Sequence, residues 1–157
     1  MPATLPEGRI LPIVTERAAL HRPSVAVGTP DADTLQLAAD MLASMYAARG
    51  VGLAAVQVGR HVRMITYDAS AERNRPEVMI DPEITWSKKT KQPYDEGCLS
   101  VPGLEFAVTR PTDVKIAYTT IDSVRTERSL GGMPARIVQH EIDHLDGILM
   151  IDPRDPA

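Results

Sequence analysis

The segment from about residue 133 to 146 constrains the fold of this chain more than any other. Its apolar residues recur at helical spacing and occupy roughly half of the helix circumference. The same half also carries His140, Glu141 and His144. The opposite half holds polar side chains, namely Arg136, Gln139, Asp143 and Asp146. Burying a carboxylate and two imidazoles costs several kcal/mol unless something pairs with them, so this helix needs both a surrounding core and a polar partner.

The spacing of these three residues is typical of a metal site. Histidines four residues apart lie one turn apart on the same helix face, and the glutamate beside the first can reach a water on a shared ion. A divalent cation is the simplest partner for the buried groups, and the alternative is a histidine pair satisfied by hydrogen bonds within the core.

A catalytic site of this type takes three protein ligands and leaves one position open. Cys98 is a candidate third ligand, because it lies in the turn-rich segment 95–100 and a thiolate binds such metals strongly. The other reading of a lone cysteine is a small buried hydrophobic residue. His21, in a proline-broken segment, and His61, directly after Arg60, are further candidates, although both fit a surface position better.

The rest of the chain divides into helices and strands that are grouped rather than alternating. Residues 1–29 are broken by prolines and predict an extended N-terminal arm. A helix is expected at about 31–48, with Thr29 as its cap and Pro30 at its first position. Antiparallel strands are expected at residues 62–67, 78–86, 113–121 and 124–130, and a last strand at residues 148–151. The predicted class is α+β, in one domain spanning residues 1–157 and packed around the helix that carries His140.

Composition limits the function classes. The chain has 157 residues, a formal net charge of −4 and only 4% aromatic residues, which argues against direct nucleic-acid binding. No apolar run approaches the roughly 20 residues of a membrane span, and the N-terminus lacks the pattern of a signal peptide. A single cysteine rules out an internal disulfide and fits a cytoplasmic location. The expected partner is a small molecule or a peptide.

Three segments together resemble the motifs of the peptide deformylase family, in the family's order. They are Gly50-Val51-Gly52-Leu53-Ala54-Ala55-Val56-Gln57, Glu96-Gly97-Cys98-Leu99-Ser100 and Gln139-His140-Glu141-Ile142-Asp143-His144. The likeness covers about residues 50–152. It implies hydrolysis of the N-formyl group from the N-terminal formyl-methionine of newly made polypeptides, with release of formate.

The resemblance also implies a role for each motif residue. Cys98, His140 and His144 are the metal ligands that it implies, and Glu141 is the group that moves the proton of the attacking water. The side-chain amide of Gln57 and the backbone N–H of Leu99 are the implied donors to the developing charge on the formyl oxygen.

Substrate-binding residues follow from the same resemblance. Val51 and Gly52 are expected to pair with the substrate backbone as an added strand. The implied pocket for the methionine side chain is lined by Val51, Tyr94, Leu99, Met133, Ile137 and His140. Glu96 and Arg110 either pair to brace the cysteine loop or are two unrelated surface charges.

The identity of the metal stays open between two ions. Two imidazoles and a thiolate suit Zn(II) and Fe(II) alike; general chemistry favours zinc, and the resemblance favours Fe(II). The chain departs from the family at Val56, where proline is usual, and this change is expected to loosen the turn without removing a reactive group. It also ends about ten residues after the metal helix, so only transient proximity to the ribosome is expected, without a C-terminal docking helix.

Two other functions compete with deformylation. A zinc peptidase shares the same helix motif but would use a third histidine or glutamate, leaving Cys98 and Gln57 without a role. A metal-binding protein without turnover would keep the metal and fail an activity assay.

Overall fold

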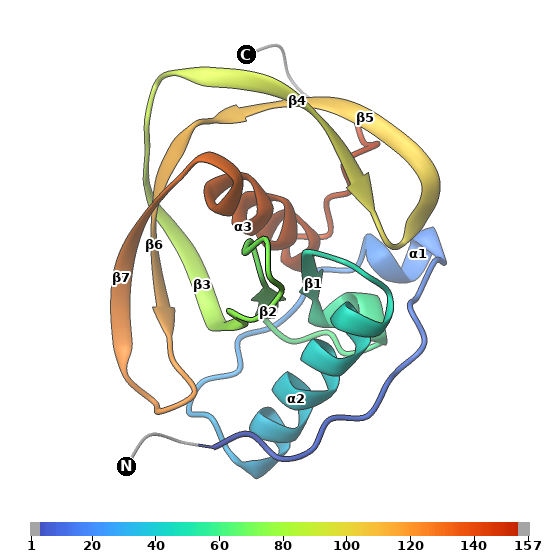
Figure 1. Ribbon diagram of the computed structural model, residues 1–157, viewed down its shortest axis with the longest axis vertical. Helices are drawn as coiled ribbons and strands as arrows, with labels where there is room; N and C mark the ends of the chain where they lie inside the picture. Colours follow the sequence, from blue (N-terminus) through green and yellow to red (C-terminus); the bar gives the residue numbers. More distant parts are fainter. Residues whose placement is uncertain (1–3, 154–157) are drawn as a thin grey trace.

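The computed structural model describes residues 4–153, and Figure 1 shows the arrangement of its elements. The expected absence of a C-terminal docking helix concerns the end of the chain, where residues 154–157 lie outside the described residues. The helices are α1 (Arg17–Leu20), α2 (Ala32–Ala47), the 3₁₀ turn η1 (Ala55–Val58) and α3 (Gly132–Leu145). The strands are β1 (Gly52–Ala54), β2 (Met64–Tyr67), β3 (Glu77–Ser87), β4 (Lys91–Cys98), β5 (Val101–Pro111), β6 (Asp113–Thr119) and β7 (Arg125–Gly131). The predicted α+β class is confirmed.

Five strands form an antiparallel sheet in the order β1-β2-β3-β6-β7. The long strand β3 pairs with β2 through its first half and with β6 through its second half, with register shifts between Ile80 and Glu83 and between Ile84 and Trp86. Strand β1 is an edge strand, because it pairs only with β2 among the named strands. Strands β4 and β5 form a separate two-stranded ribbon that arches over α3 in Figure 1.

The two long helices lie on opposite faces of the β1–β2 end of the sheet. Successive side chains of a strand point to opposite faces, so Met64 packs toward α2 and Ile65 toward α3. All four residues of β2 are therefore buried, which explains why this strand lacks an alternation of apolar and polar residues. The same alternation sends Leu53 of β1 toward α2 and Ala54 toward α3.

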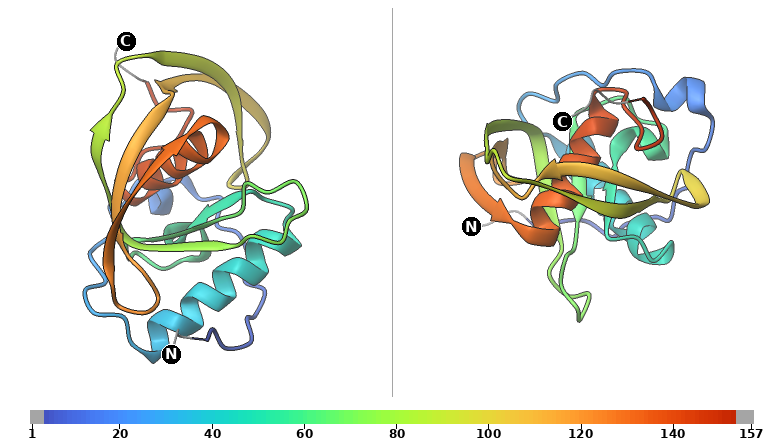
Figure 2. Two further views of the ribbon diagram at one scale, coloured as in Figure 1. Left: turned by 60° about the vertical axis from the view of Figure 1, so that its left-hand side comes forward. Right: turned by 90° about the horizontal axis from the view of Figure 1, so that it is seen from above.

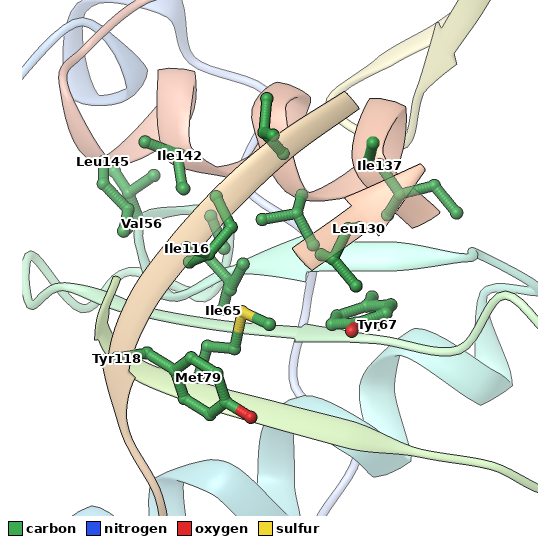
Figure 3. Close-up of a cluster of buried hydrophobic side chains, with 14 of the residues drawn as sticks. Val56, Ile65, Tyr67, Met79, Ile116, Tyr118, Leu130, Ile137, Ile142 and Leu145 are labelled. Carbon is green, nitrogen blue, oxygen red and sulfur yellow. The ribbon is translucent and has the colours of Figure 1, made fainter. Parts of the chain in front are cut away.

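Helix α3 packs on the sheet through its apolar half. Ile137, Ile142 and Leu145 point from the helix toward the strands in Figure 3, where Ile65 and Met79 meet them. Both Ile65 and Leu145 are completely buried. Truncating a buried side chain of this size to alanine typically costs about 2–5 kcal/mol, so this layer is what fixes the position of α3.

The ribbon β4–β5 covers the side of α3 that the sequence predicts to be polar. Gln139 is consequently buried rather than solvated, and its side-chain amide donates to the carbonyls of Pro111 and Ala135. Arg136 on the same side reaches the ribbon and donates to Glu96 and to the carbonyl of Val108. This half of the helix is polar, as predicted, but Gln139 and Arg136 form hydrogen bonds with other protein groups rather than pointing into solvent.

Two local predictions are wrong. The cap of α2 is Asp31 rather than Thr29, because Asp31 accepts from the Thr34 N–H while the Thr34 hydroxyl accepts from the Asp31 N–H. Residues 148–151 form no strand: residues 148–149 are irregular and residues 150–151 lie in a turn. Although Leu149 is fully buried, its N–H donates to the Asp152 carboxylate, so this segment follows a turn instead of pairing with a strand.

The described N-terminal segment, residues 4–29, has little regular secondary structure apart from the single helical turn α1. It runs along the outside of the molecule in Figure 2 and forms one isolated bridge, between Val25 and Val62. No helix in the described part of the chain is long and apolar enough to cross a membrane.

Candidate metal centre and active site

The inward half of α3 carries the candidate site, as its periodicity predicts. His140, Glu141 and His144 are 8%, 4% and 1% exposed, respectively. The two imidazole rings lie 5.1 Å apart between centroids and are inclined by 67°. One helical turn therefore places both rings on the same side of α3, beside the buried carboxylate.

The end of β4 supplies the third candidate ligand. Cys98 Sγ lies 3.3 Å from His144 Nε2, and one potential ligand atom from each of Cys98, His140 and His144 lies within 4.8 Å of the others. The structure does not bring the other two histidines to this point. His21 contacts Asp152, and His61 contacts the carbonyl of Ala19.

These residues fit a divalent cation. Ligand atoms about 2.0–2.3 Å from a tetrahedral ion lie roughly 3.3–3.8 Å from one another, which agrees with the distance between Cys98 Sγ and His144 Nε2. His140 bonds to Glu96 through Nδ1, so its Nε2 remains to face the site. The Glu141 Oε1 atom is buried and has no hydrogen-bond partner among the described residues.

The charges around the two histidines favour a cation between them. Burial alone would lower the pKa of His140, but Glu141, Cys98 and Glu96 together raise it to about 10. Burial and the positive charges of His140 and Arg110 lower the pKa of His144 to about 3, so this ring is neutral and free to act as a ligand. A bound cation would supply the positive charge that the proton on His140 otherwise supplies to the surrounding carboxylates.

Glu96 connects the metal helix to the ribbon, which confirms the pairing of Glu96 with Arg110. Its carboxylate accepts from Arg110 Nε at 2.6 Å and Nη2 at 2.9 Å, and from Arg136 Nη1 at 2.6 Å. The same carboxylate lies 2.9 Å from His140 Nδ1. Burial would raise the pKa of Glu96, but the hydrogen bonds from His140 and Arg110 outweigh it and hold the pKa at about 2. A charged Glu96 fixes the ring orientation of His140.

Gln57 points its amide nitrogen at the cysteine loop. Its Oε1 accepts from the Ala54 N–H at 2.9 Å, which turns Nε2 toward Ser100 Oγ at 3.1 Å and Cys98 Sγ at 3.7 Å. The residue before it, Val56, is completely buried in the core under α3. The turn η1 therefore directs Gln57 to the site even though Val56 replaces the proline that is usual in the family.

Two adjacent cavities open beside the site. The larger, of about 780 Å³, is lined by Gly52, Gln57, Cys98 and Leu99, among others, and the smaller measures about 350 Å³. Both cavities include His140 and Glu141 in their walls. Four of the residues expected around a methionine side chain line the smaller cavity together with His140: Val51, Tyr94, Met133 and Ile137. Leu99 lines the larger cavity instead.

Several residues of the smaller cavity are not identified by sequence patterns. Arg136 lies on the polar half of α3, and its guanidinium stacks over the Tyr94 ring at 5.3 Å from the ring centroid. Asp68 and Arg73 come from the connection between β2 and β3. A single charged residue in a polar segment belongs to no sequence motif or hydrophobic periodicity. Its contribution to the cavity wall can therefore be found only from the structure.

Comparison with known proteins gives one family. A sequence model described as polypeptide deformylase matches residues 10–157. The peptide deformylase of Acinetobacter baumannii (strain SDF) is 46% identical over 121 residues, which cover 77% of this chain and 69% of that protein.

Solved structures agree with the sequence comparison. The crystal structure of a probable peptide deformylase from Synechococcus phage S-SSM7 is 40% identical, covers 90% of this chain and 98% of its own, and superposes with a TM-score of 0.85. A class I type b peptide deformylase from Acinetobacter baumannii, crystallised with Met-Ala-Ser bound, is 34% identical, covers 91% of this chain and 97% of its own, and gives a TM-score of 0.85. The extent of these matches, together with the Cys98, His140 and His144 cluster, shows that the chain belongs to the peptide deformylase family.

Proposed function

We propose that this protein is a metal-dependent hydrolase that removes the formyl group from the N-terminal formyl-methionine of newly made polypeptides and releases formate. One observation carries the proposal. The potential ligand atoms of Cys98, His140 and His144 cluster beside a cavity of about 780 Å³ whose wall includes Cys98, His140 and the buried Glu141.

Cys98, His140 and His144 hold one divalent ion in this proposal. When bound, such an ion polarises the formyl group and lowers the pKa of its water to near neutrality. The preferred ion is Fe(II), on the basis of family membership, with Zn(II) as the alternative that a thiolate and two imidazoles also suit.

Glu141 moves the proton in the proposed reaction. Burial raises the pKa of this carboxyl to about 7, so it exchanges protons readily near neutral pH. It takes the proton from the attacking water and later gives it to the departing α-amine. Its Oε1, which has no hydrogen-bond partner among the described residues, is available for that water.

Two donors stabilise the negative charge that develops on the formyl oxygen. The Gln57 amide is one, because the Ala54 N–H already fixes its orientation and no reorientation is needed during the reaction. The backbone N–H of Leu99, on the wall of the same cavity, is the second.

The free edge of β1 is the proposed binding site for the peptide backbone. Gly52 lies opposite Tyr67, and the Val51 carbonyl accepts from the Asp68 N–H, so the polar groups of Gly52 point away from β2. They face the larger cavity, where a peptide can add as a strand. The relative with Met-Ala-Ser bound supports a peptide of this kind as ligand.

The smaller cavity then takes the methionine side chain. Its walls combine the apolar residues Val51, Met133 and Ile137 with the ring of Tyr94. Its volume of about 350 Å³ is sufficient for an unbranched thioether side chain. Because the proposed substrates are nascent chains, we infer a cytoplasmic location and transient proximity to the ribosome.

Substrate choice distinguishes this function from its rivals. The sample is purified without oxygen, its metal content is measured, and it is offered formyl-Met-Ala-Ser, acetyl-Met-Ala-Ser and unblocked Met-Ala-Ser. We expect rapid loss of formyl, slow or no loss of the larger acetyl group, and no cleavage of the peptide bonds. Cleavage of the unblocked peptide would indicate a peptidase, and full metal content without any turnover would indicate a metal-binding protein.

A further inference from the structure

The connection between β2 and β3 forms a wall of the smaller cavity. It projects from the sheet in Figure 2 and contributes Asp68, Ala69, Ser70 and Arg73 to the cavity lining. Tyr94, Met133, Arg136 and Ile137 also line this cavity. The shape of the cavity therefore depends on how this connection is held.

The connection folds around one buried carboxylate. Asp68 is completely buried and accepts from the Ser70 hydroxyl at 2.5 Å, the Tyr46 hydroxyl at 2.6 Å, the Ser70 N–H at 2.8 Å and the Arg75 N–H at 3.1 Å. Burial would raise the pKa of Asp68, but these bonds outweigh it and hold the pKa at about 2. A charged Asp68 thus fixes the turn and ties it to α2 through Tyr46.

Arg73 extends from this turn back to the start of β1. Its Nη1 donates to the Asp68 carbonyl at 3.1 Å, and its Nη2 donates to the Gly50 carbonyl. The guanidinium lies over the Tyr46 ring, 5.2 Å from the centroid. The backbone of Arg73 has a φ of 58°, a conformation that non-glycine residues rarely adopt. Arg73 therefore bridges the turn, α2 and the segment that leads into β1.

The bridged segment carries the free edge of the sheet. The Gly50 carbonyl is bonded to Arg73 and the Val51 carbonyl to the Asp68 N–H, so two successive carbonyls before Gly52 are tied to the same turn. In the next residue, Gly52, the backbone N–H and C=O point away from β2. Any shift of the turn would move this edge and the cavity wall together.

We propose that Arg73 is a positioning residue that sets the affinity for the peptide substrate. It holds the β2–β3 turn and the Gly50–Gly52 segment in the relative position that accepts a methionyl side chain and a peptide backbone at once. This inference rests on the proposed function. Among the described residues, Arg73 makes no hydrogen bond or ring contact with the metal ligands or with Glu141, so we expect its main effect on substrate binding rather than on the chemical step.

The test compares Arg73→Gln with Arg75→Gln as a matched control. Arg75 lies in the same turn, where its backbone N–H bonds to Asp68, while its side chain lines a separate cavity of about 550 Å³. For Arg73→Gln we expect the KM for formyl-Met-Ala-Ser to rise about tenfold, with kcat and metal content close to wild type and a thermal midpoint lowered by only a few degrees. Arg75→Gln should match wild type in KM, kcat, metal content and thermal midpoint. Arg73→Lys should give an intermediate KM, because an ammonium lacks the fork that reaches both carbonyls.

A second readout separates this inference from the proposed function. The affinity for Met-Ala-Ser, measured by calorimetry on the metal-loaded protein, needs no turnover and should fall by the same factor as KM rises. Equal affinities for wild type and Arg73→Gln would overturn the inference, and so would a loss of kcat at unchanged KM. If Arg73→Gln fails to fold, Tyr46→Phe provides the test. It keeps the ring under Arg73 but removes the bond to Asp68, so a smaller rise in KM supports the inference and an unchanged KM overturns it.

Discussion

Gly52 and Glu141 lie in such close contact that a Cβ atom at Gly52 would come within 2.6 Å of the Glu141 Oε2 atom and 2.8 Å of Ile137 Cγ2. The edge strand therefore packs its backbone directly against the carboxylate. This contact joins the proposed peptide-binding edge to the carboxylate that we propose moves the proton.

Gly52→Ala tests this contact. The added methyl group must displace either β1 or the Glu141 side chain, so we expect kcat/KM for formyl-Met-Ala-Ser to fall by about a hundredfold while the metal is retained. Gly97→Ala is the matched control, because its Cβ meets no atom within 4 Å although Gly97 lines both cavities. Activity of Gly52→Ala equal to that of wild type would show that the contact has no role.

Glu141→Gln tests the proton transfer. The amide keeps the size and can still bond to a water, but it cannot accept a proton near neutral pH. We expect a normal metal content and a loss of kcat of at least about a thousandfold. Metal analysis and formate release on one sample provide the measurement, and normal deformylation would remove Glu141 from the mechanism.

Cys98→Ala tests the ligand set. Two imidazoles hold a divalent ion poorly, so we expect the variant to lose the metal during dialysis and to have no activity. Ser100→Ala, in the same loop, should keep the metal, because Ser100 bonds to the Gln57 amide instead. If the Cys98→Ala variant bound metal with unchanged affinity, the third ligand would have to be another residue.

Asp68→Asn tests the buried anion of the β2–β3 turn. Because the folded pKa of Asp68 is about 2, below its ordinary value of 3.8, its stabilising effect is complete above about pH 4 and is lost as pH falls through 2. We expect wild type to exceed Asp68→Asn in unfolding free energy at pH 6, and this difference to shrink at pH 3. Urea unfolding of both proteins in a chelator provides the measurement. A difference independent of pH would show that the charge of Asp68 has no stabilising effect.

The sequence predicts the two long helices well because their apolar residues are periodic. It also locates strands β2, β3, β6 and β7, whose segments are rich in β-branched residues and are bounded by turn residues. It does not predict the three-residue edge strand β1. The ribbon β4–β5 escapes prediction for a physical reason. Most of its residues are exposed, as a two-stranded ribbon buries little on either face, and it contains Pro93 and Gly103, which disfavour strands. The sequence of residues 91–111 therefore indicates turns, although in the structure this segment forms a long β-hairpin.

The metal helix could be predicted from the sequence because its ligands are local, four residues apart on one face. Cys98 could be placed only by resemblance, since 46 residues separate it from His144. Arg73 and Arg136 could not be identified at all. Their roles come from contacts across the fold, such as Arg136 with Glu96 over 40 residues, and side chains of this kind otherwise look like ordinary surface charges.

The most direct test of the central claim is formate release from formyl-Met-Ala-Ser by anaerobically purified protein with one metal per chain, compared with Glu141→Gln at equal metal content. The account predicts saturable turnover by wild type, with one formate for each Met-Ala-Ser formed, and almost none by the variant. Formate release no faster from the metal-loaded wild type than from Glu141→Gln would contradict it.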